Sequence, residues 1–170
     1  GLFSKINFLD ILQNFTVFEP VDGRIIKKIP RYQQFRAVHK TIERLKSGTT
    51  AKDKSGVIWH TQGSGKSLTM VFLSIKMRRD PELRDHKLVF LTDRTQLDNQ
   101  LTSTFTNTQE ETIQHANSVK SLKELLAKDA SDIVTAMVQK FQENADDFEF
   151  PVLNESEKII VLADEAHRTQ

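Results

Sequence analysis

The chain has 170 residues, 38% of them hydrophobic and 28% charged, a composition that favours one soluble globular domain with its own core. Its 24 basic residues nearly balance 23 acidic ones, so net charge alone does not indicate a nucleic-acid partner, although a local basic stripe remains compatible with one. The lack of cysteine excludes disulfides and thiolate metal sites, and without an apolar run of membrane-spanning length a cytoplasmic location is expected.

The first thirty residues are expected to form a connecting arm ahead of the main domain. Four phenylalanines are scattered through this arm, and packing onto a core explains them better than a ligand site does; they are Phe3, Phe8, Phe15 and Phe18. A turn is predicted at Val21–Gly23.

The next stretch combines one helix, one loop and one short strand. Residues 33–46 carry apolar side chains at helical spacing, and Gly48 suits the end of that helix; the apolar positions are Phe35, Val38, Ile42 and Leu45. The small, polar residues 47–56, SGTTAKDKSG, predict a flexible loop. Residues 57–59, Val-Ile-Trp, are predicted to form a strand that leads into a glycine-rich loop.

The remainder of the chain shows short apolar runs separated by helical patterns. Strands are predicted at 88–91, 112–115, 133–137 and 159–163, and helices at 67–79, 96–105, 118–129 and 139–144. Continuous apolar strands that alternate with helices indicate a parallel sheet covered on both faces. The predicted fold class is therefore α/β.

The glycine-rich loop, GSGKS, is the first motif that carries chemistry. It follows the predicted strand and opens a helix, which is the context that a phosphate loop (Walker A motif) requires. Gly63 and Gly65 allow backbone N–H groups to close around phosphate oxygens at the positive end of the helix. Lys66 would neutralise phosphate charge, and the Ser67 hydroxyl would ligate Mg²⁺. The alternative is a tight strand-to-helix turn that happens to contain these residues.

The second motif is ADEAH, which follows the apolar run at 159–163. At the carboxyl end of a parallel strand, Asp164 would face the crevice where ligands bind and could hold Mg²⁺, while Glu165 could deprotonate the attacking water. An acidic helix N-terminus is the other interpretation of these residues. The phosphate loop upstream favours the catalytic interpretation.

Several polar side chains are candidates for binding the adenine base of a nucleotide or the backbone of a nucleic acid. The Gln34 amide can both donate to and accept from an adenine edge, which would select ATP over GTP, although a polar residue on a solvated helix face would look the same. Thr92, Arg94 and Thr135 lie at or near strand ends and could contact a nucleic-acid backbone. A turn with a helix cap is the alternative for them.

The order of the motifs R-x-x-Q-x-x-A, WHTQGSGKS, LTDRTQLDNQ, IVTAMVQKF and DEAH resembles that of superfamily 2 helicase-like motors. Within that group the chain is most similar to the motor subunit of type I restriction enzymes, and the resemblance covers nearly its whole length. His60 stands where the general Walker A pattern has glycine, but the same His precedes TQGSGKS in that family. The resemblance therefore implies a family variant whose turn is made by neighbouring backbone.

The resemblance implies a RecA-like motor lobe that uses ATP and Mg²⁺. The nucleotide would be bound at adenine by Arg31 and Gln34, and at the phosphates by His60, Thr61, Gln62, Gly63, Ser64, Gly65, Lys66, Ser67 and Leu68. Ser67 and Asp164 would hold the metal, while Lys66, Asp164 and Glu165 would serve hydrolysis. The implied DNA contacts are Thr92, Arg94 and Thr135, and His167 would couple the ATP site to motion.

The resemblance also implies a larger protein around this segment. In that family a nuclease domain precedes the motor, and a second lobe follows whose arginines complete the ATP site. Residues 1–30 are thus expected to connect to the nuclease domain, and residues 31–170 to form the first lobe, truncated after the DEAH motif. Alone, this segment is expected to bind nucleotide weakly and to hydrolyse almost none. The implied partners are double-stranded DNA and the methyltransferase (modification) and specificity subunits, with no membrane.

The leading hypothesis is an ATP-driven double-stranded-DNA translocase lobe, and two other functions remain open. A DEAH-type DNA helicase would separate strands, and a nucleotide-binding module would lack motor activity. An upstream Asp followed by Glu-x-Lys would favour the nuclease-bearing subunit, whereas downstream arginines would argue against the binding module. A kinase would not need DEAH, and a GTPase would need Asn-Lys-x-Asp, which the sequence lacks.

Overall fold

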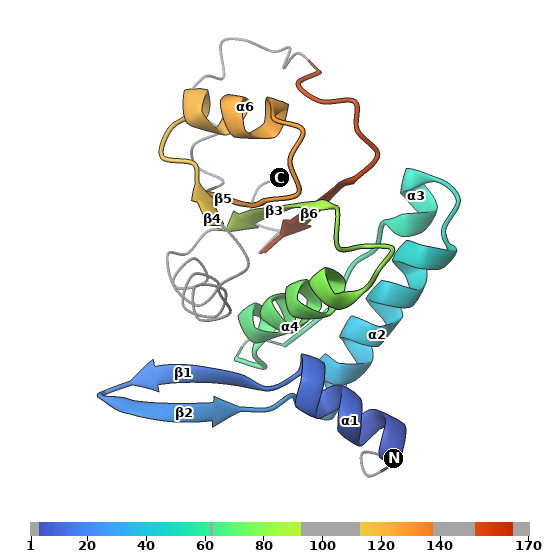
Figure 1. Ribbon diagram of the computed structural model, residues 1–170, viewed down its shortest axis with the longest axis vertical. Coiled ribbons are helices and arrows are strands. Elements are labelled where there is room, and N and C mark those ends of the chain that lie inside the picture. Colours follow the sequence, from blue (N-terminus) through green and yellow to red (C-terminus); the bar gives the residue numbers. More distant parts are fainter. Residues whose placement is uncertain (1–3, 62, 93–112, 138–151, 165–170) are drawn as a thin grey trace. The chain divides into compact units, whose positions relative to one another are not determined.

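The computed structural model describes residues 4–61, 63–92, 113–137 and 152–164, and the chain forms two units, Gly1–Arg84 and Asp85–Gln170 (Figure 1). The first unit is mainly helical, and the second is built on a parallel sheet. Among the described residues, no helix is both long and apolar enough to cross a membrane.

The first unit begins with a helix and a β-hairpin. Helix α1 (Lys5–Asn14) is followed by β1 (Val17–Val21) and β2 (Arg24–Lys28), which pair antiparallel. The predicted turn is confirmed, because Asp22 and Gly23 link the strands with φ of 50° and 75°. The arm is therefore largely regular structure, and α1 was not predicted from the sequence.

Three helices follow in this unit: α2 (Tyr32–Ser47), α3 (Ala51–Lys54) and α4 (Lys66–Arg79). The predicted helices at 33–46 and 67–79 are confirmed by α2 and α4. The loop predicted at 47–56 instead contains α3, which begins where the Thr50 hydroxyl accepts a hydrogen bond from the Asp53 N–H. Helix α4 is buried on nearly all sides, which suits its lack of a polar face.

The core of the first unit is centred on Phe15. This side chain is fully buried, and its ring centroid lies 4.9 Å from that of Phe35 and 5.5 Å from that of Phe72. It joins the end of α1 to α2 and α4. The expectation that the aromatic residues of the arm pack onto a core is thus correct for Phe15. It is wrong for Phe8 and Phe18, which are 46% and 56% exposed; Phe3 lies outside the described residues.

The strand predicted at residues 57–59 is not formed. Residues 55–61 have no regular secondary structure, and the Val57 and Trp59 side chains are 90% and 89% exposed. A short apolar run becomes a strand only when it gains a hydrogen-bonded neighbour, and the described strands form their ladders without this segment.

The second unit contains β3 (Lys87–Thr92), β4 (Ile113–His115), α6 (Val119–Ala127), β5 (Ile133–Met137) and β6 (Ile159–Ala163). All strand pairs are parallel, and the order in the sheet is β4-β5-β3-β6. The predicted α/β fold with a parallel sheet is confirmed. The helices predicted at 96–105 and 139–144 lie outside the described residues.

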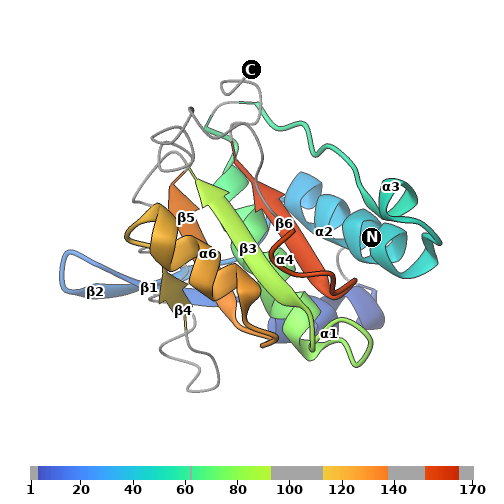
Figure 2. The same ribbon diagram turned by 90° about the horizontal axis from the view of Figure 1, so that it is seen from above.

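Helix α6 covers one face of this sheet (Figure 2). Its Leu122 and Leu125 pack in one apolar cluster with Val89 of β3 and Val134 of β5. At the amino end of β3, the buried Lys87 ammonium donates to the Leu125 carbonyl at 2.7 Å and lies 2.9 Å from the Asp132 carboxylate. This ion pair satisfies a charge that would be costly to bury alone.

Candidate nucleotide-binding site

The glycine loop has the backbone geometry of an anion cradle. Gly63 and Gly65 have φ of 73° and 89°, which side chains other than glycine rarely adopt, and α4 begins directly afterwards at Lys66. A Cβ added to Gly63 would meet no atom within 4 Å, so the space next to this backbone is open. The start of a 14-residue helix thus faces an approach that phosphate could use.

The Gly65 carbonyl is the point at which the loop is anchored. It accepts the Thr69 N–H at 3.1 Å, the Thr69 hydroxyl at 3.1 Å, and the Gln34 side-chain amide at 2.9 Å. A Cβ on Gly65 would stand 2.6 Å from the Gln34 Nε2, which no side chain tolerates without movement. The backbone conformation at residue 65 therefore favours glycine, and a Cβ there would displace the Gln34 amide. Sequence analysis did not assign a role to Thr69.

Gln34 is buried, with an exposed fraction of 2%, and both ends of its amide are engaged. Its Oε1 accepts the Arg31 backbone N–H at 2.8 Å, while its Nε2 donates to Gly65. The amide keeps one further N–H and one further lone pair, which is what a bidentate contact to adenine uses. Gln34 is therefore brought to the phosphate loop and Arg31 contacts Gln34 through its backbone, while the contact of both residues with adenine stays a prediction.

His60 and Ser64 brace the entry to the loop. The Ser64 hydroxyl donates to the Thr61 carbonyl at 2.6 Å and lies 3.2 Å from the His60 Nδ1, while the Ser64 N–H donates to the same carbonyl at 3.2 Å. The turn is thus made by backbone and a hydroxyl where the general motif has glycine. Ser67 and Leu68 lie in the first turn of α4, and Gln62 lies outside the described residues.

The second unit brings other predicted residues to the carboxyl edge of its sheet. Ala163 of β6 is in register with Leu91 of β3, and the Asp164 N–H donates to the Leu91 carbonyl at 2.9 Å. Thr92 is therefore at the carboxyl end of β3, and Asp164 directly follows the carboxyl end of the neighbouring strand β6. Ligands bind at this edge in parallel sheets. Glu165, Arg94 and His167 lie outside the described residues.

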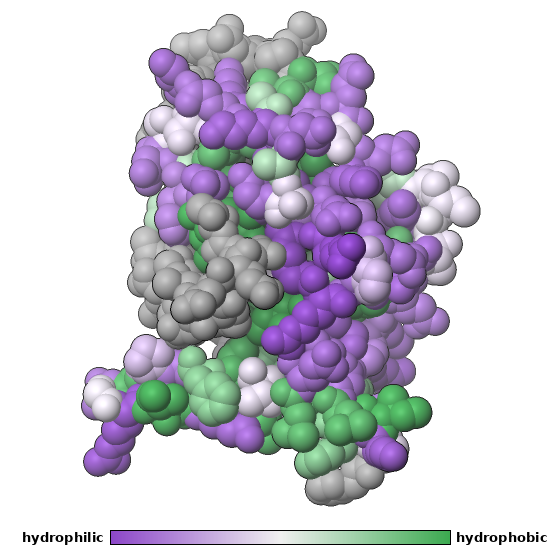
Figure 3. Space-filling model, in the orientation of Figure 1, coloured by the Kyte–Doolittle hydropathy of each residue, from purple (hydrophilic) through white to green (hydrophobic). Residues whose placement is uncertain are grey.

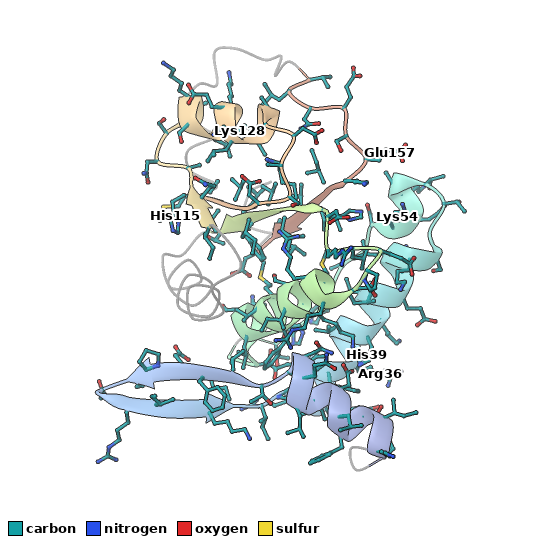
Figure 4. The ribbon with its side chains drawn as sticks, in the orientation of Figure 1. Arg36, His39, Lys54, His115, Lys128 and Glu157 are labelled. Atoms are coloured by element: carbon teal, nitrogen blue, oxygen red, sulfur yellow. The ribbon has the colours of Figure 1, made fainter. Side chains whose placement is uncertain are left out.

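The two predicted DNA-contact threonines are both buried. Thr92 is 0% exposed and Thr135 is 1% exposed, and the Thr135 hydroxyl lies 2.9 Å from the His115 Nδ1 (Figure 4). As described here, neither hydroxyl is open to a nucleic-acid backbone. Their contact with DNA stays a prediction.

The residues present fit a nucleotide-bound magnesium ion better than a site made wholly of protein. Among the described residues, no group of three or more His, Cys, Asp or Glu side chains could hold a metal. Mg²⁺ in nucleotide enzymes is typically held by one or two protein oxygens together with phosphates and water. Ser67 and Asp164 carry oxygens of this kind, and their role as Mg²⁺ ligands stays a prediction.

Comparison with known proteins assigns the family. Residues 33–170 match the model of the SWI2/SNF2 ATPase family, which is most of the chain. The chain belongs to the SWI2/SNF2 ATPase family. The match begins at the second residue of α2 and therefore contains the phosphate loop, the sheet and the DEAH motif.

The chain is also similar to type I restriction enzymes over its whole length. It is 38% identical to the type I restriction enzyme HindI endonuclease subunit of Haemophilus influenzae, which aligns with 100% of the chain. It is 38% identical to a putative type I restriction enzyme endonuclease subunit, MjaIXP, of Methanocaldococcus jannaschii, over 99% of the chain. The chain spans only 17% and 16% of the lengths of these two relatives.

Proposed function

We propose that this SWI2/SNF2 ATPase segment is the ATP-binding and hydrolysing lobe of a double-stranded-DNA translocase in a type I restriction endonuclease. The observation that carries the proposal is the loop at 63–65, whose glycines open a backbone cradle at the start of α4. The names of the relatives, which are restriction endonuclease subunits, support the biological setting.

The chemistry follows from the side chains around that cradle. Lys66 would neutralise charge on the β- and γ-phosphates, and Ser67 with Asp164 would hold Mg²⁺, which supplies electrostatic stabilisation of the transferring phosphoryl group. Glu165 would position the attacking water and accept its proton. Gln34 would bind adenine with the amide capacity that its bonds to Arg31 and Gly65 leave free.

The parent protein would use this ATPase to pull DNA past a fixed complex and to cut DNA that lacks the modification. Its partners would be the modification and specificity subunits, and it would act in the cytoplasm on invading DNA. Residues 1–30 would connect the lobe to a nuclease domain, and residues 31–170 would form the first of two motor lobes.

The decisive experiment uses the full-length subunit with its modification and specificity partners, ATP, and DNA that carries an unmodified recognition site. Displacement of a distant third strand from a triplex, without separation of the duplex, is expected for a translocase. Lys66→Ala should abolish displacement. Separation of the duplex would replace this proposal with a DEAH-type helicase, and ATP binding with neither activity would leave a non-motor nucleotide-binding module.

A further inference from the structure

Helix α1 exposes most of its apolar side chains to solvent, Ile11 being buried, and turns two of its polar side chains toward the protein. Ile6, Leu9 and Leu12 are 80%, 53% and 48% exposed, and Phe8 is 46% exposed. The inward-facing residues include Asn14, which is buried, and Asp10, whose side chain is only 14% exposed. A surface helix of a globular protein normally buries its apolar side chains against the core and exposes its polar ones.

Ion pairs and hydrogen bonds fix α1 in this orientation. The Asp10 carboxylate accepts from the Lys76 ammonium of α4 at 2.7 Å and lies 2.7 Å from the His39 Nε2 of α2 (Figure 4). It also accepts from the Asn14 amide at 2.6 Å, and the Arg79 guanidinium donates to the Asn14 Oδ1 at 3.3 Å. Rolling α1 to bury its leucines would break this network and leave Asp10 and Lys76 unpaired, so the apolar row is held outward.

The β1–β2 hairpin continues the exposed apolar residues. Phe18 and Ile25 belong to neighbouring residue pairs on the same face of the ribbon and are 56% and 77% exposed. A two-stranded ribbon alone in water is at best marginally stable, so this hairpin needs a covering element. We call the set Ile6, Phe8, Leu9, Leu12, Phe18 and Ile25 the α1–hairpin surface. Figure 3 shows apolar residues gathered over both α1 and the hairpin.

The comparisons indicate which kind of partner covers this surface. The SWI2/SNF2 family model begins at residue 33, whereas the restriction endonuclease subunits align with 99–100% of the chain and therefore share residues 1–32. The segment that carries the α1–hairpin surface is thus covered by the alignments with restriction subunits and lies outside the match to the ATPase family model. Those subunits are far longer than this chain, which spans 16–17% of them, so they hold further domains that the ATPase family model does not describe.

We propose that the α1–hairpin surface is the docking site for another domain of the same endonuclease-subunit polypeptide. Its six exposed apolar side chains resemble a permanent interface between domains, which is more hydrophobic than the contacts of partners that bind and separate. Lys27 is the register partner of Phe18 on that face of the ribbon and favours an acidic group on the docked domain. The proposal does not depend on the nucleotide site.

The test places a photo-reactive amino acid at Leu9, Leu12 or Ile25 of the full-length subunit and maps the cross-links by mass spectrometry. Lys52 on α3, which is also exposed, is the matched control position. Cross-links from the three test positions to residues of the same polypeptide beyond this segment are expected, with none from Lys52. Mixing isotopically light and heavy subunits distinguishes links within one chain from links between copies.

Links between light and heavy chains would overturn the proposal in favour of a second copy. Links to the modification or specificity subunit would do so in favour of a partner subunit, and the absence of any link at the three positions would mean that the surface stays in water. As a second measurement, Leu9→Glu with Leu12→Glu should abolish the Ile25 cross-link, whereas Lys52→Glu on α3 should leave it. Both leucines are already exposed, so this change does not touch the core of the first unit.

Discussion

Replacing Gln34 tests how recognition of the base and shape of the phosphate loop are connected. Gln34→Ala removes two hydrogen bonds, one from the Arg31 N–H at 2.8 Å and one to the Gly65 carbonyl at 2.9 Å. A net contribution of about 1 kcal/mol for each bond gives a loss of about 2 kcal/mol. If the loop needs both bonds to hold its binding conformation, the affinity for ATP should fall by roughly 30-fold.

The assay is competition of ATP and GTP against a fluorescent nucleotide on the full-length subunit. If Gln34 binds adenine, its replacement should lower the affinity for ATP more than the affinity for GTP, so that the preference for ATP becomes smaller. Gln34→Glu should be at least as damaging as Gln34→Ala, because its carboxylate can still accept from Arg31 but cannot donate to Gly65. Gln33→Ala is the matched control, since Gln33 is the exposed neighbour on the same helix.

Two outcomes would refute parts of this reasoning. Equal losses for ATP and GTP would show that Gln34 only holds the loop and does not read the base. Unchanged binding of both nucleotides in Gln34→Ala would refute both roles.

Three further predictions concern catalysis and the packing of α1. Glu165→Gln should retain ATP binding but stop turnover, and unchanged ATPase activity would remove Glu165 from its role. Phe15→Ala should lower the free energy of opening of α1, measured by hydrogen exchange, by about 3–5 kcal/mol, because this ring is fully buried, whereas Phe8→Ala should change it little. Burial raises the pKa of Asp10, but the hydrogen bonds from Lys76 and Asn14 and the positive charges nearby outweigh it, so the pKa lies below its ordinary value. The stabilisation is therefore present above a pH of about 4 and lost as the pH falls through the lowered pKa, and Asp10→Asn should flatten this dependence in hydrogen exchange of α1.

The parts of the fold that could be predicted are those whose signals are local. Strands β3, β5 and β6 are continuous apolar runs between polar segments, and α2 carries one clear apolar stripe. Helix α1 was missed because most of its apolar residues, Ile11 excepted, do not face the core, so the usual pattern for a surface helix is absent. Residues 57–59 were misassigned because a three-residue apolar run does not determine whether a neighbouring strand is available.

The candidate site shows the same division between local and distant information. The glycine spacing alone predicts the left-handed backbone at Gly63 and Gly65, since few other residues adopt it. The contact between Gln34 and Gly65 joins residues 31 positions apart, and no local pattern indicates it. The burial of Thr135 likewise depends on neighbours that only the folded sheet supplies.

Helix α4 connects the phosphate loop mechanically to α1. Its first residue, Lys66, adjoins the phosphate loop, and Lys76 near its last turn donates a hydrogen bond to the Asp10 carboxylate of α1. Fourteen helical residues span about 21 Å without a break, and a helix of this length behaves as a stiff strut. Any axial shift at the phosphate end must therefore drag α1 along or rupture the Lys76–Asp10 pair. A force applied to α1 is therefore transmitted along α4 to the phosphate loop.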